Sequence, residues 1–134
     1  MAVTTLIDDE RKSLFYHPGS KVVHHKMKTT LRGDEFRELL SAGASCLEEN
    51  RATKWLSEDR DGGVVAPADY RWGDEVWAPR VIAAGFKLWA IVVPEDAVGN
   101  LQMRRFAEEY RKRGVTVEVF TNVESALGWL EATG

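Results

Sequence analysis

The sequence has little cysteine, no long apolar run and no marked excess of either charge. The single cysteine, Cys46, has no partner for an internal disulfide, so nothing in the chain requires an oxidising compartment. The longest apolar run, residues 88–93, is far shorter than the roughly 20 residues that cross a bilayer. Residues 1–12 include three acids and no apolar core of signal-peptide length. These absences predict a cytoplasmic protein that does not enter a membrane.

The charge balance and the length indicate an ordinary folded domain. Lysine and arginine total 18 and aspartate and glutamate total 21, which gives a net charge of −3. A slightly acidic chain lacks the attraction on which non-specific binding to nucleic acids and anionic membranes depends, so we expect neither partner. A chain of 134 residues buries roughly two thirds of its unfolded surface, enough for one core without disulfides or metals. No repeat divides the sequence, so we expect a single domain.

Motifs for nucleophilic catalysis, phosphate binding and metal binding are also missing. The sequence contains no Gly-x-Ser-x-Gly elbow, no Gly-x-Gly-x-x-Gly and no Walker pattern, and Gly62-Gly63 is too short to cradle a phosphate. His24 and His25 are adjacent, so on a strand they point to opposite faces, and His17 can approach only one of them across a hairpin. Two ligands fall short of the four of a structural zinc site. We therefore expect neither a cofactor nor a metal.

Turning to what is there, apolar periodicity divides the chain into alternating strands and helices. Apolar and polar residues alternate over residues 21–29, with His25 between Val23 and Met27 on one face and His24 on the other. This pattern predicts a hairpin with one solvent-exposed face. Residues 88–93 are apolar throughout, as in a strand covered on both faces. The predicted strands are 13–17, 21–29, 54–58, 88–93 and 115–119. The predicted helices are 33–50, 67–72, 74–84 with a kink or start at Pro79, 95–113, and one that begins near residue 122.

This order of elements predicts the fold class. Alternating strands and helices imply parallel strands joined by right-handed crossovers. The first two strands, joined by the turn at residues 18–20, add an antiparallel hairpin. We therefore expect a single-domain α/β protein with a mixed four- to five-stranded sheet, an N-terminal antiparallel hairpin and packed helices.

The candidate site follows from where the parallel strands end. Ligands of open α/β sheets gather beyond the carboxyl ends of the strands, which selects the loops 59–63 and 94–96. The segment 70–80, which follows the first of these loops, is dense in aromatic rings and charge. Two tryptophans of this segment are predicted to form a lid. Its arginines have planar guanidinium groups, which can donate paired hydrogen bonds to a carboxylate or a phosphate. The candidate binding residues are Asp59, Arg60, Asp61, Trp72, Trp77 and Arg80. In the alternative interpretation, Asp59 or Asp61 caps the loop, Arg80 pairs with one of them, and the tryptophans fill the core.

Several blocks of the sequence resemble a known family. They are Lys-Trp-Leu-Ser-Glu-Asp-Arg at 54–60, the stretch Trp-Gly-Asp-Glu-Val-Trp-Ala-Pro-Arg-Val-Ile-Ala-Ala-Gly at 72–85, Ala-Ile-Val-Val-Pro-Glu-Asp at 90–96, and the segment 120–130. In this order they resemble small bacterial STAS-like proteins, relatives of the anti-sigma-factor antagonists of sporulation. The resemblance implies a four- or five-stranded mixed sheet with packed helices and no cofactor.

One departure from this family concerns its phosphorylated serine. In anti-sigma-factor antagonists that serine follows an aspartate at a helix start, in the loop after the middle strand. Here the corresponding loop, 59–64, has no hydroxyl, and Ser57 falls within the predicted strand. Asp59 matches the acid of the family loop and remains a candidate contact residue. The chain is therefore expected to lack the phosphoserine switch.

Three functions remain open from the sequence. The leading hypothesis is a non-enzymatic binding or regulatory module that recognises a protein partner or a small-molecule ligand through residues 59–80. The second is a small enzyme that uses Asp59 as acid or base, with Arg60 or Arg80 holding an anionic substrate. For this role Asp59 needs a pKa raised by burial near the tryptophans. The third is a pocket for a lipid or another hydrophobic ligand. An exposed first strand or aromatic patch would also suit a homodimer.

Overall fold

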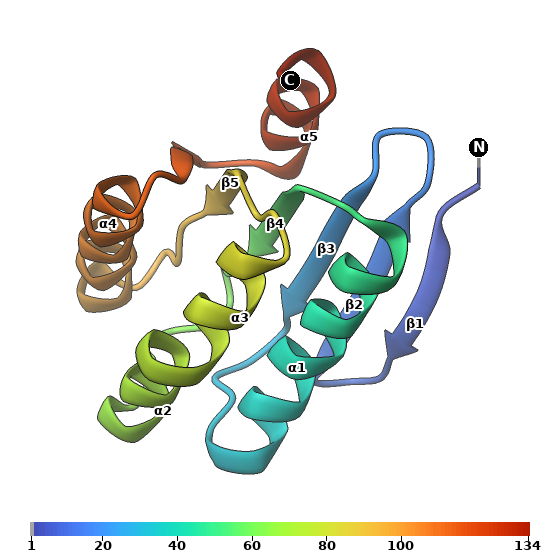
Figure 1. Cartoon of the computed structure of the whole chain (residues 1–134). Coiled ribbons are helices and arrows are strands. Elements are labelled where there is room, and N and C mark those ends of the chain that lie inside the picture. The colour runs from blue at the N-terminus through green and yellow to red at the C-terminus, as the bar shows by residue number, and fades with distance from the viewer. Residues whose placement is uncertain (1) are drawn as a thin grey trace.

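The computed structural model describes residues 2–134 and shows a mixed sheet with helices on both faces (Figure 1). The strands are β1 (Thr4–Asp8), β2 (Lys12–His17), β3 (Val22–Met27), β4 (Lys54–Glu58), β5 (Leu88–Val92) and β6 (Thr116–Phe120). The helices are α1 (Gly33–Asn50), α2 (Pro67–Trp72), the π-helical turn η1 (Gly73–Trp77), α3 (Ala78–Ala83), α4 (Ala97–Lys112) and α5 (Val123–Ala132). The predicted α/β class is confirmed.

The strands lie in the sheet in the order in which they occur along the chain. β1, β2 and β3 pair antiparallel, and β3, β4, β5 and β6 pair parallel. The sheet has six strands, so the expectation of four to five is wrong. The strand that the sequence did not reveal is β1, which lies at one edge of the sheet (Figure 1). Four of its five residues are exposed, so it lacks the apolar alternation by which strands are recognised.

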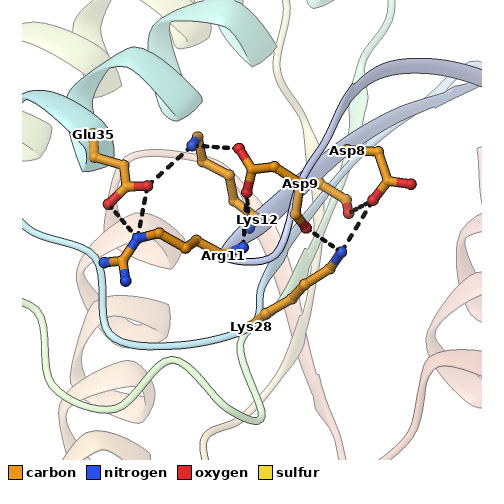
Figure 2. Close-up of polar contacts among 7 residues, drawn as sticks. Asp8, Asp9, Arg11, Lys12, Lys28 and Glu35 are labelled. Carbon is orange, nitrogen blue, oxygen red and sulfur yellow. Dashed lines mark hydrogen bonds and ion pairs between the residues drawn. The ribbon is translucent and has the colours of Figure 1, made fainter.

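Charged side chains fix the turn between β1 and β2. A side-chain oxygen of Asp9 accepts hydrogen bonds from the backbone N–H groups of Arg11 and Lys12, which closes the turn. The side chains of Arg11 and Lys12 then reach Glu35 in the first turn of α1, at 2.9 and 3.0 Å. Figure 2 shows this network between the β1–β2 turn and α1. Together these partly exposed ion pairs join the edge of the sheet to the core helix.

The start of α1 depends on a residue distant in sequence. Arg32 precedes the helix without a side-chain cap, and the Gly33 N–H instead donates to Oδ2 of Asp69 at 2.9 Å. Asp69 lies in α2, is buried, and also accepts a hydrogen bond from Arg37. This shared carboxylate docks α2 against α1, and Figure 1 shows α1, α2 and α3 side by side over the sheet.

The two faces of the sheet are covered unequally. One face carries α1, the segment from α2 to α3, and α4, and it contains most of the core. The other face packs a smaller apolar cluster against α5. His24 lies on this second face, as the alternation of β3 predicts, but only 6% of it is exposed. The expectation that this face is exposed to solvent is wrong at His24, because the His24 ring stacks on His17 and contacts Phe15.

The segment from Pro67 to Ala83 is helical throughout, whereas the sequence predicted two separate helices. Pro79, the second residue of α3, has no N–H to donate to the preceding turn. The turn before it is widened, and the Ala78 N–H reaches back five residues to the Gly73 carbonyl. Proline and π-type turns are recognised sources of local helix distortion, and π turns are frequent at functional sites.

Candidate functional site

A pocket lies between the sheet and the helices α2, η1 and α4, at the carboxyl ends of β3 and β4. Its interior volume is about 80 Å³, several times the roughly 10–15 Å³ that one water needs. The place agrees with the position at which open α/β sheets bind ligands. Three buried polar side chains from the sheet line it, His25 of β3, Ser57 of β4 and Asp59 just after β4.

Asp59 supplies the negative charge of the pocket interior. Only 5% of Asp59 is exposed, and its Oδ1 lies 2.8 Å from Nε2 of His25. Its carbonyl oxygen accepts from the Gly62 N–H, which holds the carboxylate at the start of a tight turn. Oδ2 makes no hydrogen bond with any atom of residues 2–134, and Asp59 lines the pocket. One carboxylate oxygen is therefore left for another partner.

The proton on His25 is placed by its second neighbour. Nε1 of Trp55 lies 2.9 Å from Nδ1 of His25, and both groups are buried. An indole N–H can only donate, so Nδ1 of His25 must accept and carries no proton. The ring proton is then on Nε2, where it donates to Asp59. The bond from Trp55 thus orients the His25 ring, and His25 in turn orients the carboxylate.

Ser57 is held by a second indole. Nε1 of Trp89 on β5 donates to Oγ of Ser57 at 2.8 Å, and both are buried. The hydroxyl of Ser57 keeps its own proton, so it can also donate a hydrogen bond. Sequence reasoning did not single out Ser57 or His25 as site residues. The inward place of His25 in the alternation of β3 was the signal for it, whereas its contact with Asp59 depends on the pairing of β3 with β4.

Aromatic side chains form the walls of the pocket. The Trp89 and Tyr110 rings meet edge to face with centroids 4.7 Å apart. Trp77 is 5% exposed and donates from Nε1 to the Leu40 carbonyl oxygen at 3.0 Å, so its ring is fixed. Phe106 of α4 also lines the pocket. The interior therefore combines flat apolar surfaces with one carboxylate.

Two polar contacts join the helices across the rim. The Tyr70 hydroxyl of α2 donates to Glu109 of α4, and Arg113 next to α4 pairs with Asp74 of η1. Burial and the hydrogen bond to Glu109 raise the pKa of Tyr70 to about 12. Tyr70 therefore remains a donor at neutral pH.

The loop after β4 is held against α4. The side-chain amide of Gln102 accepts from the Val65 N–H at 2.8 Å and donates to the Val65 carbonyl at 3.0 Å. The backbones also approach closely at two glycines, because a Cβ on Gly99 would lie 2.7 Å from the Gly63 carbonyl oxygen. The loop that carries Asp59 is thus positioned by its contacts with α4.

The six predicted site residues do not form one site. Trp72 lies outside the pocket, where its ring meets Phe36 edge to face and lies beneath the Arg37 guanidinium. Arg80 pairs with Glu48 of α1 at 2.7 Å, so the alternative in which it pairs with Asp59 or Asp61 is also wrong. The predicted lid of Trp72 and Trp77 is not formed, because of these two residues only Trp77 lines the pocket.

Arg60 and Asp61 lie beside the pocket and not in it. Both are exposed and line a neighbouring depression together with Arg32 and Asp96. The two hollows share Gly63 and Val64 in their walls. Within residues 2–134, therefore, no arginine lines the pocket beside Asp59, where an anionic substrate would need one.

A second polar cluster occupies the opposite face of the sheet. His17 Nε2 lies 3.0 Å from His24 Nδ1, and His24 Nε2 lies 2.9 Å from Glu58 Oε1. Burial and the neighbouring His24 lower the pKa of His17. Burial opposes ionisation of Glu58, but the hydrogen bond from His24 and the nearby Lys26 outweigh it and lower its pKa. In residues 2–134, no group of three or more His, Cys, Asp or Glu side chains is arranged to hold a metal ion.

Comparison with known proteins does not extend this description. Searches against family models, curated proteins and solved structures each found no match. Within residues 2–134, no helix has the length and apolar character that crossing a membrane requires. The STAS-like relationship remains a prediction from the sequence.

Proposed function

We propose that this chain is a binding module that takes up a small, largely apolar organic ligand in the pocket beside Asp59. The observation that carries the proposal is the Asp59 carboxylate, which is buried among aromatic rings, oriented by His25, and left with one oxygen unpaired. No buried side-chain polar atom of residues 2–134 lacks a hydrogen-bond partner, so this unbonded oxygen is accessible and available to a polar group of a ligand.

The support for a small molecule, as opposed to a protein partner, is the depth of the site. Asp59 and Trp77 are each 5% exposed, so a protein surface cannot reach them without opening the fold. Small-molecule sites are concave, mostly apolar and equipped with a few placed polar groups, as here. The π-helical turn that contributes Trp77 is a further feature common at functional sites.

A fragment screen tests the proposal directly. The purified chain, labelled with ¹⁵N, would be titrated with neutral, cationic and anionic ring-containing fragments while the indole N–H resonances of Trp89 and Trp77 are followed. We expect a subset of fragments to shift these two resonances and not that of Trp129, which lies on the opposite face. The proposal fails if no fragment shifts the pocket resonances. Native mass spectrometry would in addition show any ligand that co-purifies as added mass.

A second candidate function, acid–base catalysis by Asp59, is favoured by one observation. Asp59 is buried and its free oxygen is not used to cap the loop, so it can exchange a proton with a bound molecule. A fragment that binds would be incubated with the chain and its mass measured over time. Conversion that is lost in Asp59→Asn and kept in Asp61→Asn would indicate an enzyme. If the mass of the fragment does not change, the binding module remains the proposed function.

The STAS-like relationship belongs to the same proposal. Its support is the set of parallel strands β3 to β6 joined by helices, together with the resemblance in sequence. The loop from residue 59 to residue 66 contains no serine or threonine, so we do not extend the phosphoserine switch to this chain.

A further inference from the structure

We infer that the ligand of the pocket carries a protonated amine, which pairs with Oδ2 of Asp59 while its apolar body lies among the aromatic walls. The inference rests on the proposed function and specifies the chemical class of the ligand.

The first argument is the charge of the lining. The pocket is lined by three carboxylates, Asp59 in the interior and Asp74 and Glu109 at the rim. No lysine or arginine of the described residues lines it. Both ring nitrogens of His25 are engaged, Nδ1 with the Trp55 indole and Nε2 with Asp59, so His25 offers no free N–H to a ligand. The interior therefore presents a negative charge without a compensating cation.

The second argument compares the three charge types that a ligand can have. An anion would place its charge against Asp59, and no arginine of the described residues lines the pocket to receive it. Arg113 pairs with Asp74 at the rim, and Arg60 lines the neighbouring depression. A neutral alcohol can donate one hydrogen bond to Oδ2 but leaves the charge uncompensated. An ammonium group supplies both the donor and the charge, and charge-assisted hydrogen bonds are roughly twice as strong as neutral ones.

The third argument is the nature of the walls. Aromatic faces attract cations through the ring quadrupole, most strongly for tryptophan. Trp77, Trp89 and Tyr110 line the pocket around the polar floor. The same rings offer flat surfaces to an aromatic or short aliphatic body. The interior volume of about 80 Å³ is roughly half that of a cavity that encloses benzene, so the interior takes the ammonium group and part of the ring while the rest of the ligand lies at the rim.

Three probes of nearly equal shape isolate the charge. Benzylamine, benzyl alcohol and benzoate would each be titrated into the ¹⁵N-labelled chain at about pH 7, and dissociation constants taken from the Trp89 indole resonance. We expect benzylamine to bind at least about tenfold more tightly than benzyl alcohol, since the ion pair is added to the same ring contacts. Benzoate is expected to bind more weakly than both.

Matched variants assign the effect to Asp59. In Asp59→Asn the preference for benzylamine over benzyl alcohol should disappear, whereas Asp61→Asn, an equal change of charge two residues away and exposed, should retain it. Because Asp59→Asn removes a buried contact, its amide spectrum would first be compared with that of the unsubstituted chain. Should this variant not fold, the ranking of the three probes on the unsubstituted chain still decides.

The outcomes separate the inference from the proposed function. If benzyl alcohol and benzylamine bind equally, or if benzoate binds most tightly, the inference of an amine ligand is overturned. The proposed function as a ligand-binding module then still holds. If none of the three probes shifts the Trp89 resonance, the amine inference is overturned. The proposed function is then overturned only if the full fragment set fails as well.

Discussion

Nε1 of Trp55 donates a hydrogen bond to Nδ1 of His25 over 2.9 Å, deep between β4 and β3. This one bond selects the tautomer of His25 and thereby turns its other nitrogen into the donor that orients Asp59. The chemistry of the pocket therefore depends on a tryptophan that is entirely buried.

Replacing Trp55 should accordingly destabilise the fold. Trp55→Phe removes the donor, leaves Nδ1 of His25 unpaired and opens a small cavity, so we expect the free energy of unfolding to fall by about 2–4 kcal/mol. Urea unfolding measures this. Trp129→Phe is the matched control, because Trp129 is only partly buried on the other face, and its loss should be below about 1 kcal/mol. Equal losses for the two variants would contradict the role given to Trp55.

The contact between α1 and Trp55 yields a second prediction. A Cβ on Gly43 would lie 2.3 Å from the Trp55 ring. Gly43→Ala should therefore lower the free energy of unfolding by about 1–3 kcal/mol through overpacking. Gly128→Ala on α5 meets no atom within 4 Å and should raise it by up to about 1 kcal/mol, since alanine favours a helix over glycine. Calorimetric melting of both variants tests the contrast, which fails if Gly43→Ala is neutral.

Arg80 should matter for stability and not for ligand binding. It pairs with Glu48 on α1, at a site distinct from the pocket. Arg80→Ala is expected to cost less than about 1 kcal/mol, because the pair is partly exposed and screened by solvent. A double-mutant cycle with Glu48→Ala measures the pairing energy, and the benzylamine titration measures binding. Weakened binding in Arg80→Ala would restore Arg80 to the site.

The cluster on the α5 face predicts a pH dependence of stability. The pKa of His17 is lowered in the fold by burial and by His24, although Glu131 on α5 acts in the opposite direction. Below its ordinary value of 6.5 the unfolded chain therefore binds a proton that the folded chain resists, so stability falls as pH is lowered from about 7 to about 5. Glu58, whose pKa is lowered, contributes stability that is present above 4.5 and lost at more acidic pH.

Urea unfolding at several pH values between about 5 and 7.5 checks this prediction. His17→Asn should show a smaller fall in unfolding free energy across that window, because the group that takes up the proton is gone. Identical slopes for the variant and the unsubstituted chain would show that His17 does not titrate differently in the fold.

The sequence predicts the central strands and the long helix of this fold better than the strand at the edge of the sheet. Periodicity identified α1 and the strands β2 to β6, because each buries one face or both and so carries an apolar pattern. β1 gave no such signal, since Leu6 is 49% exposed and the strand is held by pairing with β2 and by charged side chains at the turn. Pairing of an exposed edge strand depends on its neighbour, which a linear pattern does not contain.

The site shows a similar division. Asp59 could be placed from the rule for strand ends, whereas the partners of its carboxylate could not, because they depend on the register of β3 against β4. The pair Trp72 and Trp77 misled for a geometrical reason. The π-helical turn η1 runs from the residue after Trp72 to Trp77 and changes the direction of the side chains along it, and of the two only Trp77 lines the pocket.

The neighbouring residues His24 and His25 lie on opposite faces of β3, and His17 is the only other histidine of the chain. An imidazole spectrum of this protein therefore contains three rings, of which one lines the pocket and two lie on the opposite face of the sheet. Spectroscopy of a single residue type can thus follow ligand entry on one side of the sheet and proton uptake on the other, independently and in the same sample.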